Sequence, residues 1–117
     1  MQDFRKLKVW EKAHQLTLAI YAATKDFPKD ELYGVTSQMR RAAASIPTNI
    51  AEGCGRGSDA DFARFVQIAL GSASELEYLV VLARDLNYLS PEQASFLEAA
   101  IQEIKRMLTG LIKTLRA

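Results

Sequence analysis

Apolar residues recur at alternating spacings of three and four in four separate segments of this chain, and this pattern constrains the fold more than any other feature. In the first segment they are Val9, Ala13, Leu16, Ile20, Ala23 and Phe27. A helix of 3.6 residues per turn brings such positions onto one face, whereas a strand needs a period of two. No stretch alternates with period two, so we predict an all-α protein without a sheet.

The spacing and the capping signals predict helices at residues 8–26, 36–54, 59–88 and 91–116. Thr36 or Ser37 can cap the second helix, and Ser90 followed by Pro91 and Gln93 has the sequence of a capping box. Four amphipathic helices with short connections predict an up-down-up-down four-helix bundle. With 117 residues, 49% of them hydrophobic, we expect a single domain spanning 1–117.

Pro47 lies inside the second predicted helix, where it removes one backbone hydrogen bond at a cost of about 3 kcal/mol. Either one helix is kinked at this position or two helices meet there. A new helix starting at Pro47 would use Ile46 as its N-cap, and isoleucine caps poorly. We therefore favour a kinked helix that ends at Gly53, Gly55 and Gly57. The small residues of 71–74 interrupt the third helix, and we expect another helix to approach closely there.

The composition argues against several classes of protein. No segment has the ~18 uninterrupted apolar residues of a membrane span, and the N-terminus lacks an apolar run of signal-peptide length, so we expect a cytoplasmic protein without membrane association. The single cysteine, Cys54, excludes an intramolecular disulfide and fits a reducing compartment. The net charge of +1 lacks the marked basic excess of most nucleic-acid-binding domains.

Residues suited to catalysis or metal binding are scarce. Glu11 and His14 have the Glu-x-x-His spacing of di-iron bundles, but they lie on the helix face away from the core positions, and the chain has no second histidine. Cys54 has no nearby histidine to activate it. The glycine-rich loop at 53–57 lacks the preceding strand and the Gly-Lys-Ser/Thr ending of a phosphate-binding loop. We therefore expect no enzyme activity, no metal and no cofactor.

The second predicted helix has a flank of mostly small residues, formed by Arg40, Ala44, Pro47 and Ala51. Small side chains let another backbone come close, so this flank is either ordinary exposed surface or an interface between subunits. The candidate interface residues are Trp10, Ala44, Pro47, Asn49, Ala51 and Glu52.

Six cations are candidates for contacts with nucleic-acid phosphates: Lys6, Lys8, Lys12, Arg40, Arg41 and Arg56. Guanidinium groups form paired hydrogen bonds with phosphate oxygens. Arg40 and Arg41 can equally well form ion pairs with acidic residues of this chain, namely Glu52, Glu75 or Glu77. The sequence leaves both interpretations open.

Several short motifs follow one another along nearly the whole chain. They are LKVW at 7–10, FPKDELYG at 27–34, SQMRRA at 37–42, SIPTNIAEG at 45–53, GR at 55–56, FARF at 62–65 and GSASEL at 71–76. Together they resemble the bacterial four-helix-bundle proteins encoded in intervening sequences of 23S ribosomal RNA genes. That family is similar to the accessory proteins of diversity-generating retroelements. The resemblance implies a homo-oligomer, with a pentamer as the expected assembly, and RNA, DNA or a reverse transcriptase as partner.

Two functional hypotheses follow. The first is a non-enzymatic, ring-forming bundle that binds structured nucleic acid through a basic edge made by the six cations. The second is a protein-interaction adaptor whose charged residues serve contacts between subunits. Charge reversal of Arg40 and Arg41 separates them, because it weakens nucleic-acid binding in the first case and dissociates the oligomer in the second.

Overall fold

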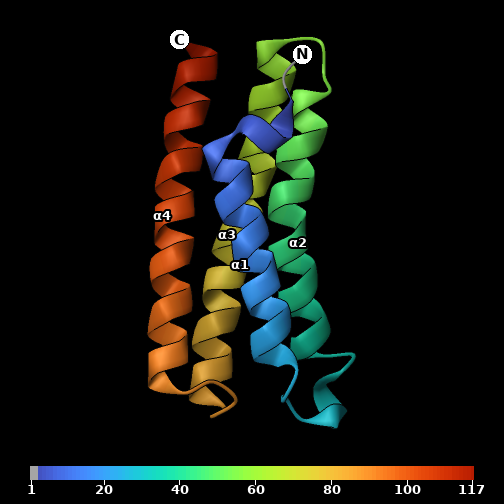
Figure 1. Cartoon of the computed structure of the whole chain (residues 1–117), viewed down its shortest axis with the longest axis vertical. Coiled ribbons are helices and arrows are strands. Elements are labelled where there is room, and N and C mark those ends of the chain that lie inside the picture. Colours follow the sequence, from blue (N-terminus) through green and yellow to red (C-terminus); the bar gives the residue numbers. More distant parts are fainter. Residues whose placement is uncertain (1–2) are drawn as a thin grey trace.

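Four α-helices account for most of the computed structural model, which describes residues 3–117. They are α1 (Lys8–Thr24), α2 (Val35–Cys54), α3 (Asp59–Asp85) and α4 (Pro91–Arg116), as Figure 1 shows. Two short 3-10 helices, η1 (Phe4–Lys6) and η2 (Lys29–Glu31), precede α1 and α2. No strand occurs among the described residues, and the predicted all-α class is confirmed.

The helices run alternately up and down, and each packs against the next in sequence while α1 also packs against α4 (Figure 1). The diagonal pairs, α1 with α3 and α2 with α4, make no backbone approach within 8 Å. This arrangement is the predicted up-down-up-down bundle. Its principal extents are 43 × 23 × 20 Å, so the molecule is about one long helix in length.

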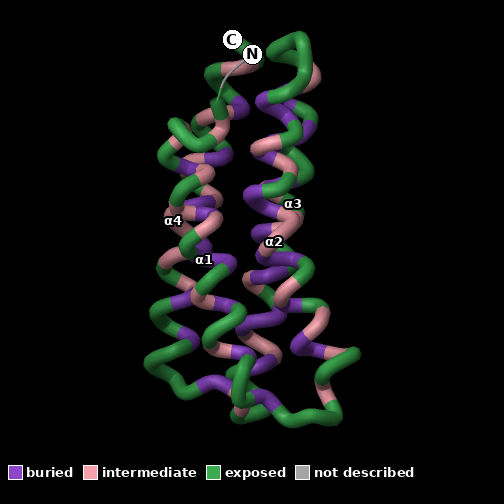
Figure 2. Tube along the Cα trace, turned by 45° about the vertical axis from the view of Figure 1, so that its right-hand side comes forward, coloured by how far each residue is buried: buried purple, intermediate pink, exposed green. Residues whose placement is uncertain are grey.

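Buried residues occur along all four helices from one end of the bundle to the other (Figure 2), and their side chains form one hydrophobic core. The apolar spacing of the second segment predicts six core positions, and all are buried: Val35, Met39, Ala42, Ala43, Ile46 and Ile50. In the third segment the spacing that includes Leu79 and Ala83 continues to Leu86 and predicts it in the core, but Leu86 is 43% exposed. The reason is that α3 stops at Asp85, and Asn87 turns the chain with a left-handed φ of 64°.

Helix α2 continues through Pro47 as one α-helix, so the alternative of two helices meeting there is wrong. The hydroxyl of Thr17 on α1 donates to the carbonyl oxygen of Ala43 at 3.1 Å. Pro47 is itself buried. The interior proline is therefore accommodated within the packing of α1 against α2.

The start of α2 differs from the prediction, because α2 begins at Val35 and Thr36 is buried inside it instead of capping it. The backbone N–H of Val35 instead donates to a side-chain oxygen of Glu31, at 3.3 Å. The other carboxylate oxygen of Glu31 accepts a 2.8 Å hydrogen bond from the hydroxyl of Tyr88. One glutamate thus joins the turn before α2 to the turn after α3. The capping box of Ser90 and Gln93 forms as predicted.

Close approach of two helices occurs at Gly53 and not at Gly71. A Cβ atom at Gly53 would lie 2.7 Å from the Phe62 ring, whereas one at Gly71 would meet nothing within 4 Å. In the small-residue segment of α3, Ser72 instead hydrogen-bonds to Ser45 on α2, with 2.8 Å between the hydroxyl oxygens. Gly53 is therefore the residue that lets the end of α2 rest against the start of α3.

By length and composition alone, α3 is apolar enough to cross a membrane, with a mean hydropathy of 1.4 over its most apolar 18 residues. In the bundle this helix contributes ten buried residues to the interior. Only 39% of that apolar window is buried, however. The large apolar side chains that remain exposed on this helix are Ile68 and Tyr78.

Candidate nucleic-acid and subunit interfaces

Arg40 makes its contacts within the chain. Its Nε donates to the hydroxyl of Thr24 at 2.8 Å, and its guanidinium lies 4.7 Å from the centre of the Tyr21 ring. Both partners belong to α1. The half-buried Arg40 therefore joins α1 to α2, and this role differs from both interpretations left open by the sequence.

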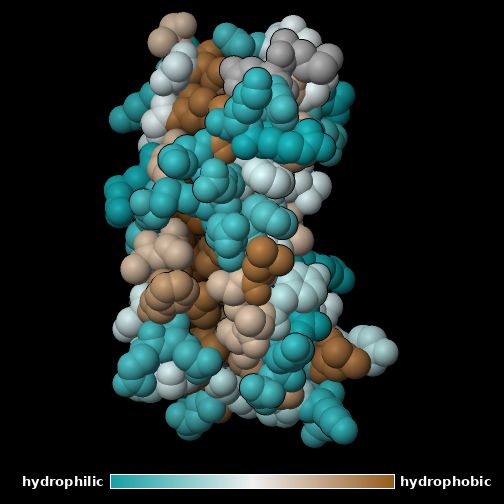
Figure 3. Space-filling model, viewed as in Figure 1, coloured by the Kyte–Doolittle hydropathy of each residue, from teal (hydrophilic) through white to brown (hydrophobic). Residues whose placement is uncertain are grey.

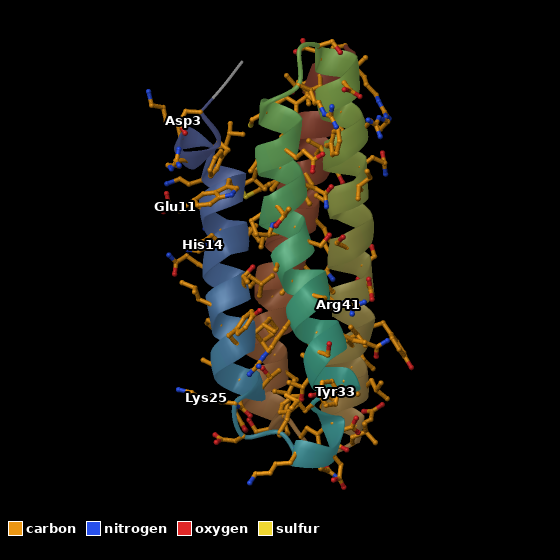
Figure 4. All side chains as sticks on the ribbon, turned by 90° about the vertical axis from the view of Figure 1, so that its right-hand side faces the viewer. Asp3, Glu11, His14, Lys25, Tyr33 and Arg41 are labelled. Carbon is orange, nitrogen blue, oxygen red and sulfur yellow. The ribbon has the colours of Figure 1, made fainter. Side chains whose placement is uncertain are left out.

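Arg41, the next residue, is exposed. It lies on the side of α2 that faces away from α1: in Figure 4, Glu11 and His14 of α1 are at the left and Arg41 is at the right. It forms no ion pair with any described residue. Glu52 pairs with Arg56 and Glu77 pairs with Lys105 instead. Of the two interpretations left open for Arg41, pairing with an acidic residue of its own chain is thus absent from residues 3–117.

Arg56 lies beyond the other end of α2. Its guanidinium contacts Glu52 at 3.2 Å and Asp61 at 3.7 Å, and lies 4.7 Å from the centre of the Phe65 ring. The part of α2 between Arg40 and its last residue, Cys54, alone rises about 21 Å. The predicted grouping of the arginines at one edge is therefore not what the structure shows.

The three predicted lysines lie on η1 and the first turns of α1. Lys6 and Lys8 are exposed and make no ion pair with a described residue. Lys12 lies 3.3 Å from the carboxylate of Glu103 and so connects α1 to α4. Lys6 and Lys8 are thus the two predicted lysines that have no ion-pair partner within residues 3–117.

Charge is separated along α4, a feature that the sequence reading missed. All three acidic residues of this helix lie at or before position 103, and all four cations lie at or after position 105. A shallow depression of about 310 Å³ is lined by Lys105, Arg106, Thr109, Gly110 and Lys113. The signal is present in the sequence, but the net charge of +1 for the whole chain conceals it. We call Lys6, Lys8, Arg106, Lys113 and Arg116 the cationic end.

The predicted interface residues are divided among three places. Trp10, Ala44, Pro47 and Ala51 line a groove of about 390 Å³ between α1 and α2. Pro47 is buried and Ala44 and Ala51 are half-buried, so the chain itself covers much of the small-residue flank. Beside the groove the Trp10 ring is stacked on His14, with ring centres 5.1 Å apart.

The two remaining interface candidates lie away from that groove. The side chain of Asn49 donates to the carbonyl oxygen of Ser45 at 2.8 Å, on the side of α2 that meets α3 through the Ser45–Ser72 bond. Glu52 is exposed and pairs with Arg56. The six residues therefore do not form one continuous surface.

An apolar groove between α1 and α4 was not predicted. Its two adjoining hollows, of about 550 and 490 Å³, both include Ala19 and Phe96. Phe96 is 68% exposed and Leu18 is 51% exposed. Figure 3 shows this apolar area in the lower half of the molecule, between α4 and α1. We call the surface made by Leu16, Leu18, Ala19, Ala22, Phe96 and Ala100 the α1–α4 groove.

No grouping of three or more metal-binding side chains occurs within residues 3–117. Cys54 is buried, and burial raises the pKa of its thiol, which keeps it protonated and unreactive near neutral pH. His14, the chain's single histidine, is half-buried against Trp10. The described residues thus bring together neither a nucleophile with a base nor a metal ligand set.

The fold and these surfaces define a small all-α protein, a four-helix bundle with a cationic end and an open apolar groove. The family model of the 23S rRNA-intervening sequence protein matches residues 5–110, and the chain belongs to this family. The family resemblance drawn from the sequence motifs is therefore confirmed.

Among solved structures, the chain is similar to a protein of unknown function from the S23 ribosomal protein family of Bacteroides thetaiotaomicron VPI-5482. The two are 29% identical with a TM-score of 0.81, and the match covers 90% of this chain and 98% of that one. A comparison with curated proteins finds no match.

Proposed function

We propose that this protein is a non-enzymatic, homo-oligomeric helical bundle of the cytoplasm that binds RNA, or DNA, through phosphate contacts at its cationic end. The observation that carries the proposal is the separation of charge along α4. The last 14 residues of the chain contain four cations and no acidic residue. Lys6 and Lys8 add two unpaired charges at the same end of the bundle (Figure 1).

The helix dipole accounts for only part of this distribution. Cations in the last turn of a helix, here Lys113 and Arg116, are each stabilised by roughly 0.3–1 kcal/mol. Arg106 lies more than two turns earlier and gains nothing from the dipole, which acts only within the last turn. Its exposed guanidinium, beside the depression at Thr109 and Gly110, is suited to a phosphate group.

The family description supports RNA as the first ligand to test, and a pentameric ring is the assembly we propose. We also propose a reverse transcriptase as a partner, on the resemblance of the sequence motifs to the accessory proteins of diversity-generating retroelements. The alternative function is a protein-interaction adaptor, and the exposed α1–α4 groove favours it. The two functions differ in whether the purified protein binds nucleic acid.

The test is a titration of a fluorescent RNA hairpin, and of DNA of the same sequence, over a series of salt concentrations. Phosphate contacts make log affinity fall linearly with log salt, by about 0.9 per contact on a duplex. The variant Arg106→Gln, Lys113→Gln, Arg116→Gln should bind at least tenfold more weakly and reduce the slope by about two to three.

The control variant Arg40→Gln, Arg56→Gln, Arg64→Gln removes the same number of charges from α2, α3 and the turn between them. It should retain affinity within about twofold, since all three arginines already have partners among the described residues. An equal loss in both variants would contradict the placement at the cationic end. If neither RNA nor DNA binds at low salt, the proposed nucleic-acid function is wrong and the protein-interaction adaptor is the remaining hypothesis.

A further inference from the structure

We propose that the α1–α4 groove of one copy receives the outer face of α3 from a second copy, so that the subunits join head to tail. This inference rests on the homo-oligomer in the proposed function, and it names the two surfaces that meet. Neither surface includes the small-residue flank of α2 that the sequence indicated.

The groove has the size and chemistry to accept a helix. It extends along α1 from Glu11 to Ala23, a rise of about 18 Å or roughly three helical turns. Ala19 and Ala100 leave space along its floor, while Phe96 projects beside them with 68% of its surface exposed. An exposed apolar groove of this extent is typical of surfaces that bind a partner.

The outer face of α3 offers a matching ridge. Ile68, Gly71, Glu75, Tyr78 and Leu82 follow one another at spacings of three and four, which places them in one stripe on the helix. Ile68 is 43% and Tyr78 is 61% exposed, and a side chain at Gly71 would meet nothing within 4 Å. The stripe rises about 21 Å, close to the length of the groove. It accounts for part of the apolar surface of α3 that the core leaves uncovered.

Charge favours the α3 stripe over a second groove as the occupant. The lining of the groove contains Glu11, Glu92 and Glu103, and its one lysine, Lys12, already pairs with Glu103. Pairing two grooves would bring these acidic side chains face to face, which is unfavourable. Beside the α3 stripe lies Arg41, one turn along α2 from the Ser45–Ser72 contact. The stripe itself contains one acidic side chain, Glu75, and the guanidinium of Arg41, which pairs with no described residue, offsets that charge. A groove that faces the stripe therefore brings fewer acidic side chains together than a groove that faces a second groove.

The positions of the two surfaces determine the kind of assembly. Helices α1 and α3 occupy opposite corners of the bundle, at the left and right edges of Figure 4. Each copy can therefore offer its groove to one neighbour and its α3 stripe to another. A contact between two different surfaces produces a ring if the rotation closes and a filament if it does not.

The experiment measures solution mass by analytical ultracentrifugation for two variants, Phe96→Glu in the groove and Ile68→Glu with Tyr78→Glu on the stripe. All three side chains are exposed in a single copy, so the bundle should fold, as circular dichroism and the melting temperature will show. Each variant alone should be monomeric. An equimolar mixture should form dimers and nothing larger, because one intact groove and one intact stripe remain. Tyr33→Glu, in the turn before α2 and 93% exposed, is the control and should keep the wild-type mass.

The contrary outcomes are distinct. If the wild type is oligomeric and either variant retains its mass, the subunits meet elsewhere and this inference fails while the oligomer stands. If the groove variant is monomeric but the mixture also stays monomeric, the groove pairs with something other than the α3 stripe. If the wild type is a monomer, both the homo-oligomer and this docking mode are wrong, whatever the RNA titration shows.

Discussion

The hydroxyl of Thr17 lies 3.1 Å from the carbonyl oxygen of Ala43, the acceptor that Pro47 leaves without its usual donor. In a regular helix the N–H of residue 47 would donate to this carbonyl, and proline has no N–H. Thr17 also lies 2.9 Å from the carbonyl oxygen of Ala13, which already has a donor within α1. A side chain of one helix thus compensates for the missing backbone donor of the next.

This relationship predicts a coupling between Thr17 and Pro47. Thr17→Val keeps the shape of the side chain but leaves the Ala43 carbonyl buried without a donor, at a cost of about 1–3 kcal/mol in the free energy of unfolding. In a Pro47→Ala background, where residue 47 supplies an N–H, the same substitution should cost less. A double-mutant cycle by urea denaturation measures the difference, and strictly additive effects would disprove the coupling. Thr17→Ser retains the hydroxyl and is the control.

Gly53 and Gly71 should respond oppositely to alanine. At Gly53 the new Cβ would lie 2.7 Å from the Phe62 ring and 3.0 Å from Cβ of Phe65, so Gly53→Ala should lower the free energy of unfolding by about 1–3 kcal/mol. At Gly71 there is open space inside a helix, so Gly71→Ala should raise it by roughly 0.5–1 kcal/mol. Urea unfolding of both variants is the measurement, and equal signs would contradict the packing described at Gly53.

Substitution of Arg40 and substitution of Arg41 should differ more in their effect on protein stability than in their effect on RNA affinity. Arg40→Ala loses the hydrogen bond to Thr24 and the contact with the Tyr21 ring, so the free energy of unfolding should fall by about 1 kcal/mol. Arg41→Ala removes an exposed side chain and should change it by less than about 0.5 kcal/mol. Thermal unfolding and RNA titration of both variants provide the test. If Arg40→Ala weakened RNA binding at unchanged stability, Arg40 would be a phosphate contact after all.

Glu77 should make the stability depend on pH in acid. The hydrogen bond from the Lys105 ammonium at 2.8 Å, with a second bond from Gln102, lowers the pKa of the Glu77 carboxyl. Because the folded pKa lies below the unfolded value of about 4.3, the contribution is present above that pH and is lost as the pH falls through the folded pKa.

The measurement for Glu77 is urea unfolding between pH 7 and pH 3. Glu77→Gln should destabilise the protein by no more than about 1 kcal/mol at pH 7, since 34% of the Glu77 side chain is exposed and water screens the pair. The difference from wild type should shrink in acid. Glu75→Gln, at an exposed position on the same helix, is the control, and a Glu77 effect that persists at the lowest pH would refute the argument.

The fold could largely be predicted because the spacing of apolar residues indicates which face of each helix is buried. The α2 positions from Val35 to Ile50 that were assigned to the core are all buried. The errors lie where a helix begins or ends. Leu86 continues the spacing of α3, but the turn at Asn87 removes it from the core. Thr36 has the chemistry of a cap, yet the N–H of Val35 is bonded to Glu31 before the helix reaches it.

The surfaces were less predictable because they depend on residues far apart in the sequence. The sequence around Arg40 does not predict its contacts with Thr24 and Tyr21, which lie on another helix. In the same way, the sequence around Arg56 does not predict its contacts with Asp61 and Phe65. The α1–α4 groove arises from the spacing between the first and last helices, which periodicity within each helix does not determine. The charge separation along α4 could be predicted from the sequence, but only by comparing the charges before and after Glu103.

An even number of antiparallel helices returns the chain to the end where it started, so Asp3 and Ala117 both lie at the cationic end (Figure 1). An affinity tag or fluorescent protein fused to either terminus would therefore lie close to the proposed phosphate-binding surface and could obstruct it. A dye for the binding titrations belongs at the opposite pole, for example on a cysteine introduced at Lys29 in the exposed turn between α1 and α2.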